Sequence, residues 1–233
     1  MNSPTADGGF GARFKLKAIV CAMRANHGKS VSDYRAIAAD YDRRTRLVNA
    51  VRLEAVAALH LRPGDTVLDA ACGSGYSFVS ISKAIGNEGR LLAFDHSPEL
   101  LAIARSRIEQ DNIALIEATA EQVTLPGRRP DALLFSYTHD VLQSEAALDN
   151  LLGQAAPGAR VALCGSVLWP AWAWPVNTWL RARHRHYITN MENFDRPWAK
   201  IAPRLENFKV SRRGPGWRYL ASGRLRGAQR SAR

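Results

Sequence analysis

Two acidic residues and a pair of glycines carry the clearest chemical signal in this 233-residue sequence. Asp69 ends a short apolar run, and Gly73 and Gly75 follow it in a loop of small residues. Asp95 ends the next apolar run, 20 residues after Gly75. A carboxylate at the end of a second strand can accept hydrogen bonds from both hydroxyls of a ribose. The pattern therefore predicts a site for a cofactor that contains a nucleoside.

The segments around these residues alternate between strand and helix patterns. We expect strands at 66–70, 90–95, 112–118, 131–136, 160–165, 207–210 and 218–221. We expect helices at 32–60 with a break near 42–44, and at 76–85, 97–108 and 140–155. Such alternation predicts right-handed crossovers and a mostly parallel sheet, with ligands bound beyond the carboxyl ends of its strands.

Two kinds of cofactor compete for the loop. The dinucleotide fingerprint G-x-G-x-x-G needs a third glycine where helix and strand pack closely, and Phe78 occupies that position. The segment Val67–Gly75 (VLDAACGSG) instead resembles the first motif of class I S-adenosylmethionine-dependent methyltransferases. Ala71 stands where that family often has glycine, a difference that costs little if its φ stays negative. The balance favours S-adenosylmethionine.

The resemblance covers about residues 30–165 and is greatest to the small-molecule branch, which includes quinone and lipid methyltransferases. It implies an α/β three-layer sandwich around a seven-stranded, mostly parallel Rossmann-like sheet. An antiparallel last strand and an N-terminal helical cap belong to the same expectation. It also implies cofactor contacts from a set of loop and strand-end residues: Asp69, Ala71, Gly73, Gly75, Asp95, His96, Thr119, Ala120 and Ser136.

Methyl transfer from a sulfonium proceeds in line, so the protein mainly aligns the two reactants. His139 is the best candidate general base because imidazole titrates near neutral pH, and a polar loop role is its alternative. Tyr41 of the Tyr41-Asp42 pair is expected over the sulfonium, unless it is a core residue. Tyr137 is expected to shape the pocket, and Asp140 to begin a D-x-x-Q capping box.

A tryptophan-rich segment follows the expected fifth strand. Four of the six tryptophans lie in residues 168–179, and an arginine-rich run follows directly. Three interpretations remain open: an aromatic lid over the substrate, an interfacial membrane contact, and a packed helix or homodimer contact. The lid interpretation assigns substrate contacts to four residues: Trp169, Trp172, Trp174 and Asn177.

The net charge of +11 is unevenly distributed. Residues 61–160 hold 8 basic and 13 acidic residues, whereas residues 161–233 hold 14 and 3. We divide the chain into a basic N-terminal tail or helix (1–30), a helical cap (31–60), a cofactor-binding core (61–165), a Trp/Arg-rich substrate-side cap (166–205), the last two strands (206–225) and a basic tail (226–233). The excess positive charge therefore lies in the part of the chain that is expected to face the second substrate, and not in the cofactor-binding core.

These observations predict an S-adenosylmethionine-dependent methyltransferase for a small, amphiphilic or acidic molecule. Transfer or cyclisation of the aminocarboxypropyl arm would use the same motifs and is the main alternative. An RNA methyltransferase and a non-enzymatic cofactor-binding scaffold are less favoured, and nucleic acid is an unlikely partner. Three scattered cysteines predict no disulfide scaffold and a cytoplasmic location, with peripheral membrane contact as an option. No spacing predicts a metal site.

Overall fold

A seven-stranded sheet forms the centre of the computed structural model, which describes residues 49–184, 188 and 190–227. Its strand order is β3-β2-β1-β4-β5-β7-β6. The strands are β1 (Thr66–Ala70), β2 (Arg90–Asp95), β3 (Ile113–Glu117), β4 (Ala132–Ser136), β5 (Arg160–Ser166), β6 (Leu205–Arg213) and β7 (Arg218–Leu225). The first five pair in parallel, and β7 runs antiparallel to both β5 and β6. The predicted fold class is confirmed.

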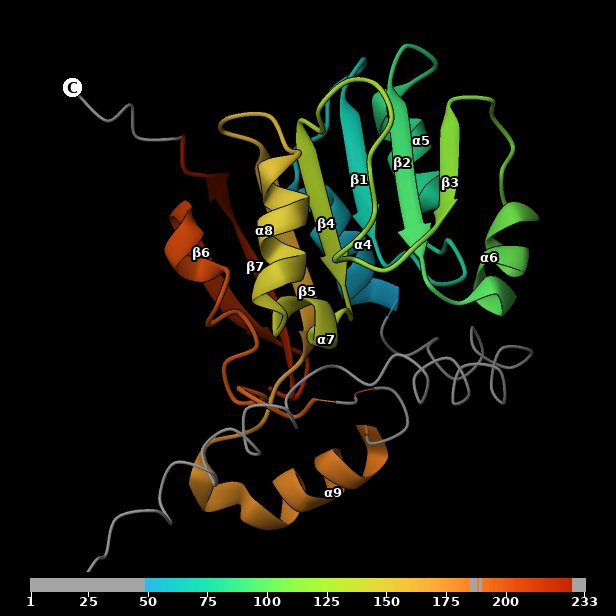
Figure 1. Ribbon diagram of the computed structural model, residues 1–233. Helices are drawn as coiled ribbons and strands as arrows, with labels where there is room; N and C mark the ends of the chain where they lie inside the picture. The colour runs from blue at the N-terminus through green and yellow to red at the C-terminus, as the bar shows by residue number, and fades with distance from the viewer. Residues whose placement is uncertain (1–48, 185–187, 189, 228–233) are drawn as a thin grey trace, which may run out of the picture.

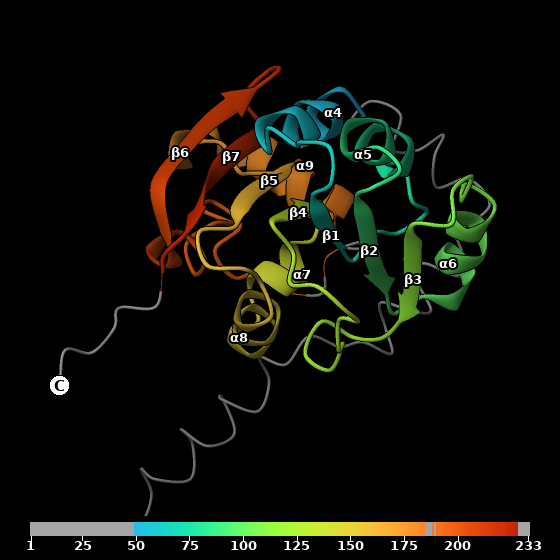
Figure 2. The ribbon, with the colours of Figure 1, turned by 90° about the horizontal axis from the view of Figure 1, so that it is seen from above.

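Helices cover both faces of the sheet and make it a three-layer sandwich (Figures 1 and 2). One face carries α4 (Asn49–Ala58) and α5 (Phe78–Ile85), and the other carries α7 (His139–Leu142) and α8 (Glu145–Gly153). α6 (Pro98–Arg105) packs near the β2–β3 edge. Because both faces are covered, all five residues of β1 are buried, as expected for a central parallel strand.

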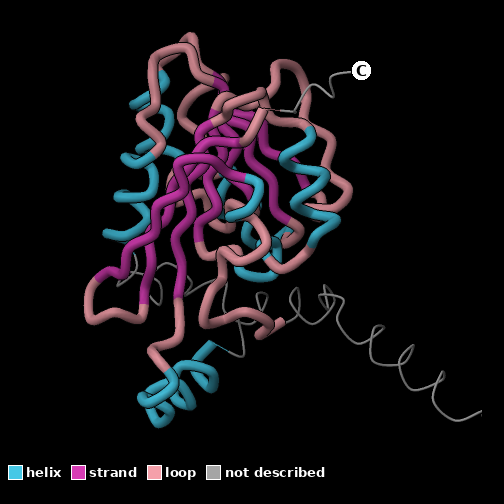
Figure 3. Tube along the Cα trace, turned by 90° about the vertical axis from the view of Figure 1, so that its left-hand side faces the viewer, coloured by secondary structure: helices cyan, strands magenta, loops and turns pink. Residues whose placement is uncertain are grey.

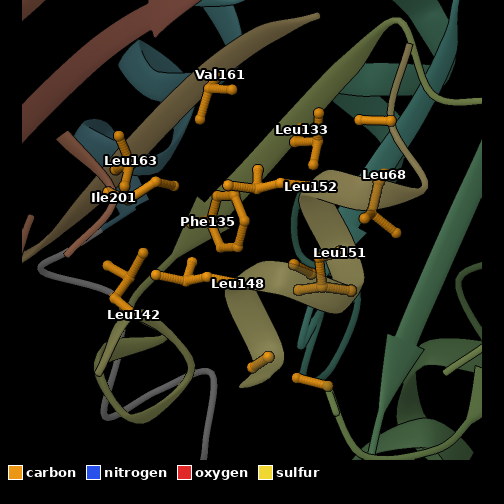
Figure 4. Close-up of a cluster of buried hydrophobic side chains, with 14 of the residues drawn as sticks. Leu68, Leu133, Phe135, Leu142, Leu148, Leu151, Leu152, Val161, Leu163 and Ile201 are labelled. Atoms are coloured by element: carbon orange, nitrogen blue, oxygen red, sulfur yellow. The ribbon is translucent and has the colours of Figure 1, made fainter. Parts of the chain in front are cut away.

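Two apolar clusters hold the layers together, one on each side of the sheet. Figure 4 shows the cluster under α8, which includes Leu148 and Leu151 of α8 and Leu133 and Phe135 of β4. Val51 and Leu59 belong to the opposite cluster, together with Phe78 of α5. Each fully buried side chain of this size contributes about 1.5–3 kcal/mol, so the sheet is fixed from both sides.

The predicted start of α6 is confirmed. The Ser97 hydroxyl accepts a hydrogen bond from Leu100 N at 3.3 Å, and Pro98 occupies the first turn. This cap fixes where β2 ends, and so it fixes the direction in which the chain leaves Asp95.

The prediction of one helix over 140–155 is wrong, because α7 ends at Leu142 and α8 begins at Glu145. Ser144 has extended backbone angles, and its hydroxyl accepts a hydrogen bond from Ala147 N at 3.2 Å. Asp140 lies inside α7 and caps nothing; its carboxylate accepts from Asn190 N at 3.1 Å. Gln143 donates to Pro197 O at 2.9 Å. The D-x-x-Q spacing therefore makes tertiary contacts, not a capping box.

The last two strands extend beyond their predicted bounds, since β6 begins at Leu205 and β7 ends at Leu225. Their antiparallel pairing gives hydrogen-bond partners to backbone groups of residues that lie outside the predicted strands. The basic segment 1–30 and the larger part of the 31–60 cap lie outside the described residues, as does the tail from residue 228. The proposed division into domains remains a prediction.

The Trp/Arg-rich segment forms η4 (Ala171–Ala173) and α9 (Trp174–His184), which lie beyond the carboxyl ends of the parallel strands (Figures 1 and 3). A small third cluster of Leu168, Leu180, Ile188 and Phe194 holds α9 to the segment that precedes η5 (Ala202–Arg204). α9 therefore rests on its own small apolar base rather than on either face of the sheet.

Candidate functional site

The loop after β1 turns through three residues with positive φ. These are Ala71 (50°), Gly73 (57°) and Gly75 (73°). Cys72 N donates to Phe94 O at 2.8 Å, so the loop is tied to β2. The expectation that Ala71 keeps a negative φ is wrong. Ala71 adopts a left-handed backbone conformation that costs a non-glycine residue about 1–2 kcal/mol.

Phe78 explains why the loop lacks the third glycine of a dinucleotide fingerprint. Its ring is fully buried and lies directly on Gly75, where an added Cβ would come within 2.7 Å of the ring. Gly75 is therefore required by both its φ and its close contact.

Asp95 joins the two predicted motifs. One carboxylate oxygen accepts from Gly73 N at 2.8 Å and the other from Ser97 N at 2.9 Å. The side chain is almost fully buried, and burial raises its pKa, an effect that His96 at 3.6 Å opposes. Each carboxylate oxygen has a second lone pair, so this arrangement can still accept hydrogen bonds from ribose hydroxyls.

Other predicted cofactor residues end neighbouring strands of the same edge. Ala118 N donates to Asp95 O at 3.1 Å, so the segment that carries Thr119 and Ala120 begins beside Asp95. Thr119 is half-buried and Ala120 is buried. Ser136 ends β4, and its hydroxyl accepts from the Cys164 thiol at 3.5 Å. Asp69, Asp95, Thr119 and Ser136 thus lie at or just beyond the carboxyl ends of β1 to β4.

Asp69 is deeply buried, and this burial raises its pKa to about 7, with Arg52 opposing the rise and Asp95 adding to it. Its Oδ2 has no hydrogen-bond partner among the described residues. The same is true of the buried Nε of Arg52, which α4 brings to the site. An orphan carboxylate oxygen and an orphan guanidinium nitrogen can hold the ammonium and carboxylate of an amino-acid group.

Sequence reasoning missed Arg52, although a signal existed. Arg52 lies four residues after Val48 and four before Val56, on the apolar stripe of its helix. Its guanidinium lies over the rings of Tyr76 at 5.6 Å and Tyr137 at 5.2 Å. A charged residue on an apolar stripe is costly unless it is paired, so that position marked it as a functional candidate.

Two of the three predicted catalytic residues, Tyr137 and His139, lie in the described part of the chain, and they contact different groups. Tyr137 lies at the end of β4 with a φ of 60°, and it contacts the Arg52 guanidinium. His139 is buried, and its Nε2 lies 3.0 Å from Glu192 O, with its ring edge-on to Phe194. Because a carbonyl only accepts, Nε2 carries a proton, and any basic role falls to Nδ1. Tyr41 lies outside the described residues, and the catalytic roles of all three remain predictions.

The predicted substrate residues border one cavity of about 490 Å³, with the exception of Trp172. Trp169, Trp174 and Asn177 line it, and its charged lining residues are Arg181, Arg212 and Asp195. The Asn177 amide also closes the segment on itself, since its oxygen accepts from Trp169 N at 2.8 Å and its nitrogen donates to Trp169 O at 3.1 Å. Their contact with a substrate remains a prediction.

The described residues form neither a metal cluster nor a membrane-spanning helix. No group of three or more His, Cys, Asp or Glu there could hold a metal ion. No described helix is both long and apolar enough to cross a bilayer. The cysteines that the structure describes, Cys72 and Cys164, are free thiols.

A family model covers the strand ends, the glycine loop and Asp95. Residues 67–158 match the family model of the methyltransferase domain. This part of the chain is a methyltransferase domain of the class I S-adenosylmethionine-dependent family, and S-adenosylmethionine is the cofactor of that family.

Named relatives point to the quinone-type branch. The chain is 34% identical to a 2-phytyl-1,4-naphtoquinone methyltransferase of Synechococcus elongatus over 107 residues, 44% of this chain and 46% of that protein. It is 28% identical to a ubiquinone/menaquinone biosynthesis C-methyltransferase of Azotobacter vinelandii over 106 residues, 43% of this chain and 42% of that protein. These alignments span less than half of each relative, and residues 159–233 lie outside the matched family model.

Solved structures share the fold. A methyltransferase from Aquifex aeolicus superposes with a TM-score of 0.55 at 19% identity, covering 82% of this chain and 97% of that one. A geranyl diphosphate C-methyltransferase from Streptomyces coelicolor gives 0.59 at 16% identity, covering 78% and 80%. At these identities the likeness establishes the fold alone.

Proposed function

We propose that this protein transfers the methyl group of S-adenosylmethionine to a small, amphiphilic acceptor. The observation that carries the proposal is the hydrogen bond between Gly73 N and Asp95, which joins the glycine loop to the ribose acid. It fixes two strand ends in the relation that a nucleoside cofactor needs.

Three residues of this chain bind and orient the cofactor in this proposal. Asp95 accepts from the ribose hydroxyls, while Asp69 and Arg52 hold the two charged groups of the methionine end. Asp69 Oδ2 and Arg52 Nε are buried and lack a hydrogen-bond partner among the described residues, and charge pairing is stronger in a buried environment than in water. Tyr76 and Tyr137 flank Arg52 and limit its movement. When bound, the cofactor supplies an electrophilic methyl group, so alignment and exclusion of water are the main tasks of the protein.

The amphiphilic character of the acceptor is supported by two observations. Relatives in the quinone-type branch carry names of quinone methyltransferases. The cavity beyond the strand ends combines two tryptophans with Arg181, Arg212 and Asp195, which suits an aromatic or apolar body with a polar group. A 2-alkyl-1,4-naphthoquinol is therefore the first acceptor to test.

Calorimetric titration with S-adenosylhomocysteine tests the cofactor site. Replacing the ribose acid in Asp95→Asn should weaken binding about 10- to 100-fold, because charged hydrogen bonds are lost. Glu117→Gln is the matched control, since Glu117 pairs with Asp95 in the sheet but is exposed. Equal affinities of Asp95→Asn and wild type would overturn the site.

Mass spectrometry of the reaction products tests the chemistry. Adenosylhomocysteine together with a methylated naphthoquinol would support the proposal. Methylthioadenosine would replace it with transfer or cyclisation of the aminocarboxypropyl arm. Methylation of RNA but of no small molecule would replace it with RNA methylation.

A further inference from the structure

The Trp/Arg segment, residues 169–182, exposes three of its four tryptophan side chains to solvent. Trp172, Trp174 and Trp179 are 74%, 70% and 56% exposed. Together with Val176 they make up four of the seven large apolar side chains that are exposed in the described part of the chain. Apolar side chains gathered in this way mark an interaction surface rather than ordinary scatter.

The segment has a definite inner and outer side. Ala173 and Leu180 are its buried residues between 171 and 182, and Leu180 packs into the small third cluster. At 3.6 residues per turn, Trp174 and Trp179 are separated by about 140° around the helix axis. Exposed Pro175, Thr178 and Ala182 fall within that arc. The outer face is therefore an uncharged strip with a tryptophan on each border, and Trp174 and Thr178 on this strip also line the cavity.

Arginine is the only charged residue type in the sequence of this segment, and Asp195 and Arg212 line the cavity beside it. Residues 166–191 contain no Asp or Glu and three arginines, Arg181, Arg183 and Arg185. Arg181 is exposed and lies one turn beyond Asn177 on α9. Tryptophan prefers the headgroup level of a bilayer, and a nearby arginine is attracted to anionic lipid. The exposed tryptophans and the neighbouring arginine are therefore the features of this segment that fit the headgroup level of a bilayer.

We propose that the Trp/Arg segment docks on the surface of an anionic phospholipid bilayer, with the outer face of η4 and α9 at the headgroup level. A second copy of this chain fits less well, because a two-fold contact would bring two acid-free, arginine-bearing segments together.

Docking in this way also orients the cofactor edge. α9 follows β5 and lies beyond the same carboxyl ends that carry Asp69 and Asp95 (Figures 1 and 3). The bilayer would then face the edge of the sheet where ligands bind. An amphiphilic acceptor could enter from the lipid phase without crossing water. Only this last consequence depends on the proposed function.

Flotation of the full chain with lipid vesicles tests the docking itself and needs neither cofactor nor turnover. The probes are phosphatidylcholine vesicles with and without phosphatidylglycerol. Wild type should float with the anionic vesicles, less so at high salt, because screening weakens the arginine attraction. Its tryptophan fluorescence should shift to shorter wavelength on binding. The triple variant Trp172→Ala/Trp174→Ala/Trp179→Ala should partition at least about tenfold less.

The matched control is Val79→Ser/Val210→Ser, which removes exposed apolar side chains outside the segment. It should float like wild type, and thermal denaturation checks that both variants are folded.

The proposal is overturned if wild type stays with the protein-only fraction, or if the triple variant floats as well as wild type does. It is also overturned if the triple substitution leaves vesicle binding unchanged but converts a dimer to a monomer in gel filtration, since the partner is then a second copy. If wild type floats with the vesicles but does not methylate the naphthoquinol, the result counts against the proposed function and not against docking.

Discussion

At the scale of single residues, the site combines strain and unpaired charge. Ala71 adopts a left-handed backbone conformation directly after β1, and Asp69 lies buried at the end of the same strand. Both features reduce the stability of the unliganded protein. Both are at the position where the cofactor is expected, so binding can recover part of that energy.

Replacing Ala71 by glycine should relieve the left-handed strain. We expect Ala71→Gly to raise the free energy of unfolding by about 1 kcal/mol, measured by urea denaturation. The neighbouring Ala70→Gly is the control, because Ala70 lies in β1, where glycine destabilises. If Ala71→Gly destabilised the protein as Ala70→Gly does, the strain interpretation would be wrong.

Asp69 should make stability depend on pH. Burial raises its pKa from 3.8 to about 7, so the native state keeps the proton where the unfolded chain has released it. The free energy of unfolding therefore falls between about pH 4 and pH 7 and is then level. Asp69→Asn, which is neutral at every pH, should gain on wild type by a few kcal/mol over that range. Denaturation at several pH values measures this, with Glu117→Gln as control; a constant difference would contradict the raised pKa.

At the scale of elements, short caps decide where helices begin. Ser144 ends the α7 turn and starts α8, and its hydroxyl also donates to Glu121 at 2.8 Å. This contact ties α8 to the segment after β3. The break between α7 and α8 thus directs Asp140 and Gln143 toward the loop that covers His139.

Ser144→Ala should therefore lower the free energy of unfolding by about 1–2 kcal/mol, through loss of the cap and of the Glu121 contact. Ser106→Ala is the control, because the Ser106 hydroxyl is exposed and donates only within its own turn, to Ile103 O. That variant should stay within about 0.5 kcal/mol of wild type. An equal effect of the two substitutions would show that Ser144 has no special capping role.

At the scale of the whole molecule, stability is unevenly distributed. The sheet is packed on both faces, whereas α9 rests on a cluster built from Leu168, Leu180, Ile188 and Phe194. The segment that holds the most exposed tryptophans thus packs on the smallest of the three apolar clusters. Elements with few buried contacts open first.

Hydrogen exchange followed by mass spectrometry should show this difference directly. Amides of α9 should exchange at least about 100-fold faster than those of β1 and β4, because local opening of α9 needs no disruption of the sheet. Anionic vesicles should slow exchange in α9 and leave the strands unchanged. Equal protection of α9 and the central strands without vesicles would mean that the small cluster is not an independent unit.

Local patterns in the sequence were enough to predict the sheet and the cofactor loop. Continuous apolar runs, a glycine-containing loop and two acids at strand ends follow from contacts that are close along the chain. The antiparallel end of the sheet came from the family resemblance rather than from any local signal. The split between α7 and α8 was missed because Ser144 acts as the N-cap of α8 only when its backbone leaves the helical region.

The sequence by itself determined the chemistry of the strand ends, since Asp69, Gly73, Gly75 and Asp95 lie within 27 residues and their types restrict the ligand. Only the tertiary structure brought Arg52 to Asp69, joined Gly73 to Asp95 by a hydrogen bond, and turned three tryptophans of the Trp/Arg segment toward solvent. The physical reason is that burial, charge pairing and exposure depend on neighbours distant in sequence, whereas motif and periodicity depend on near ones.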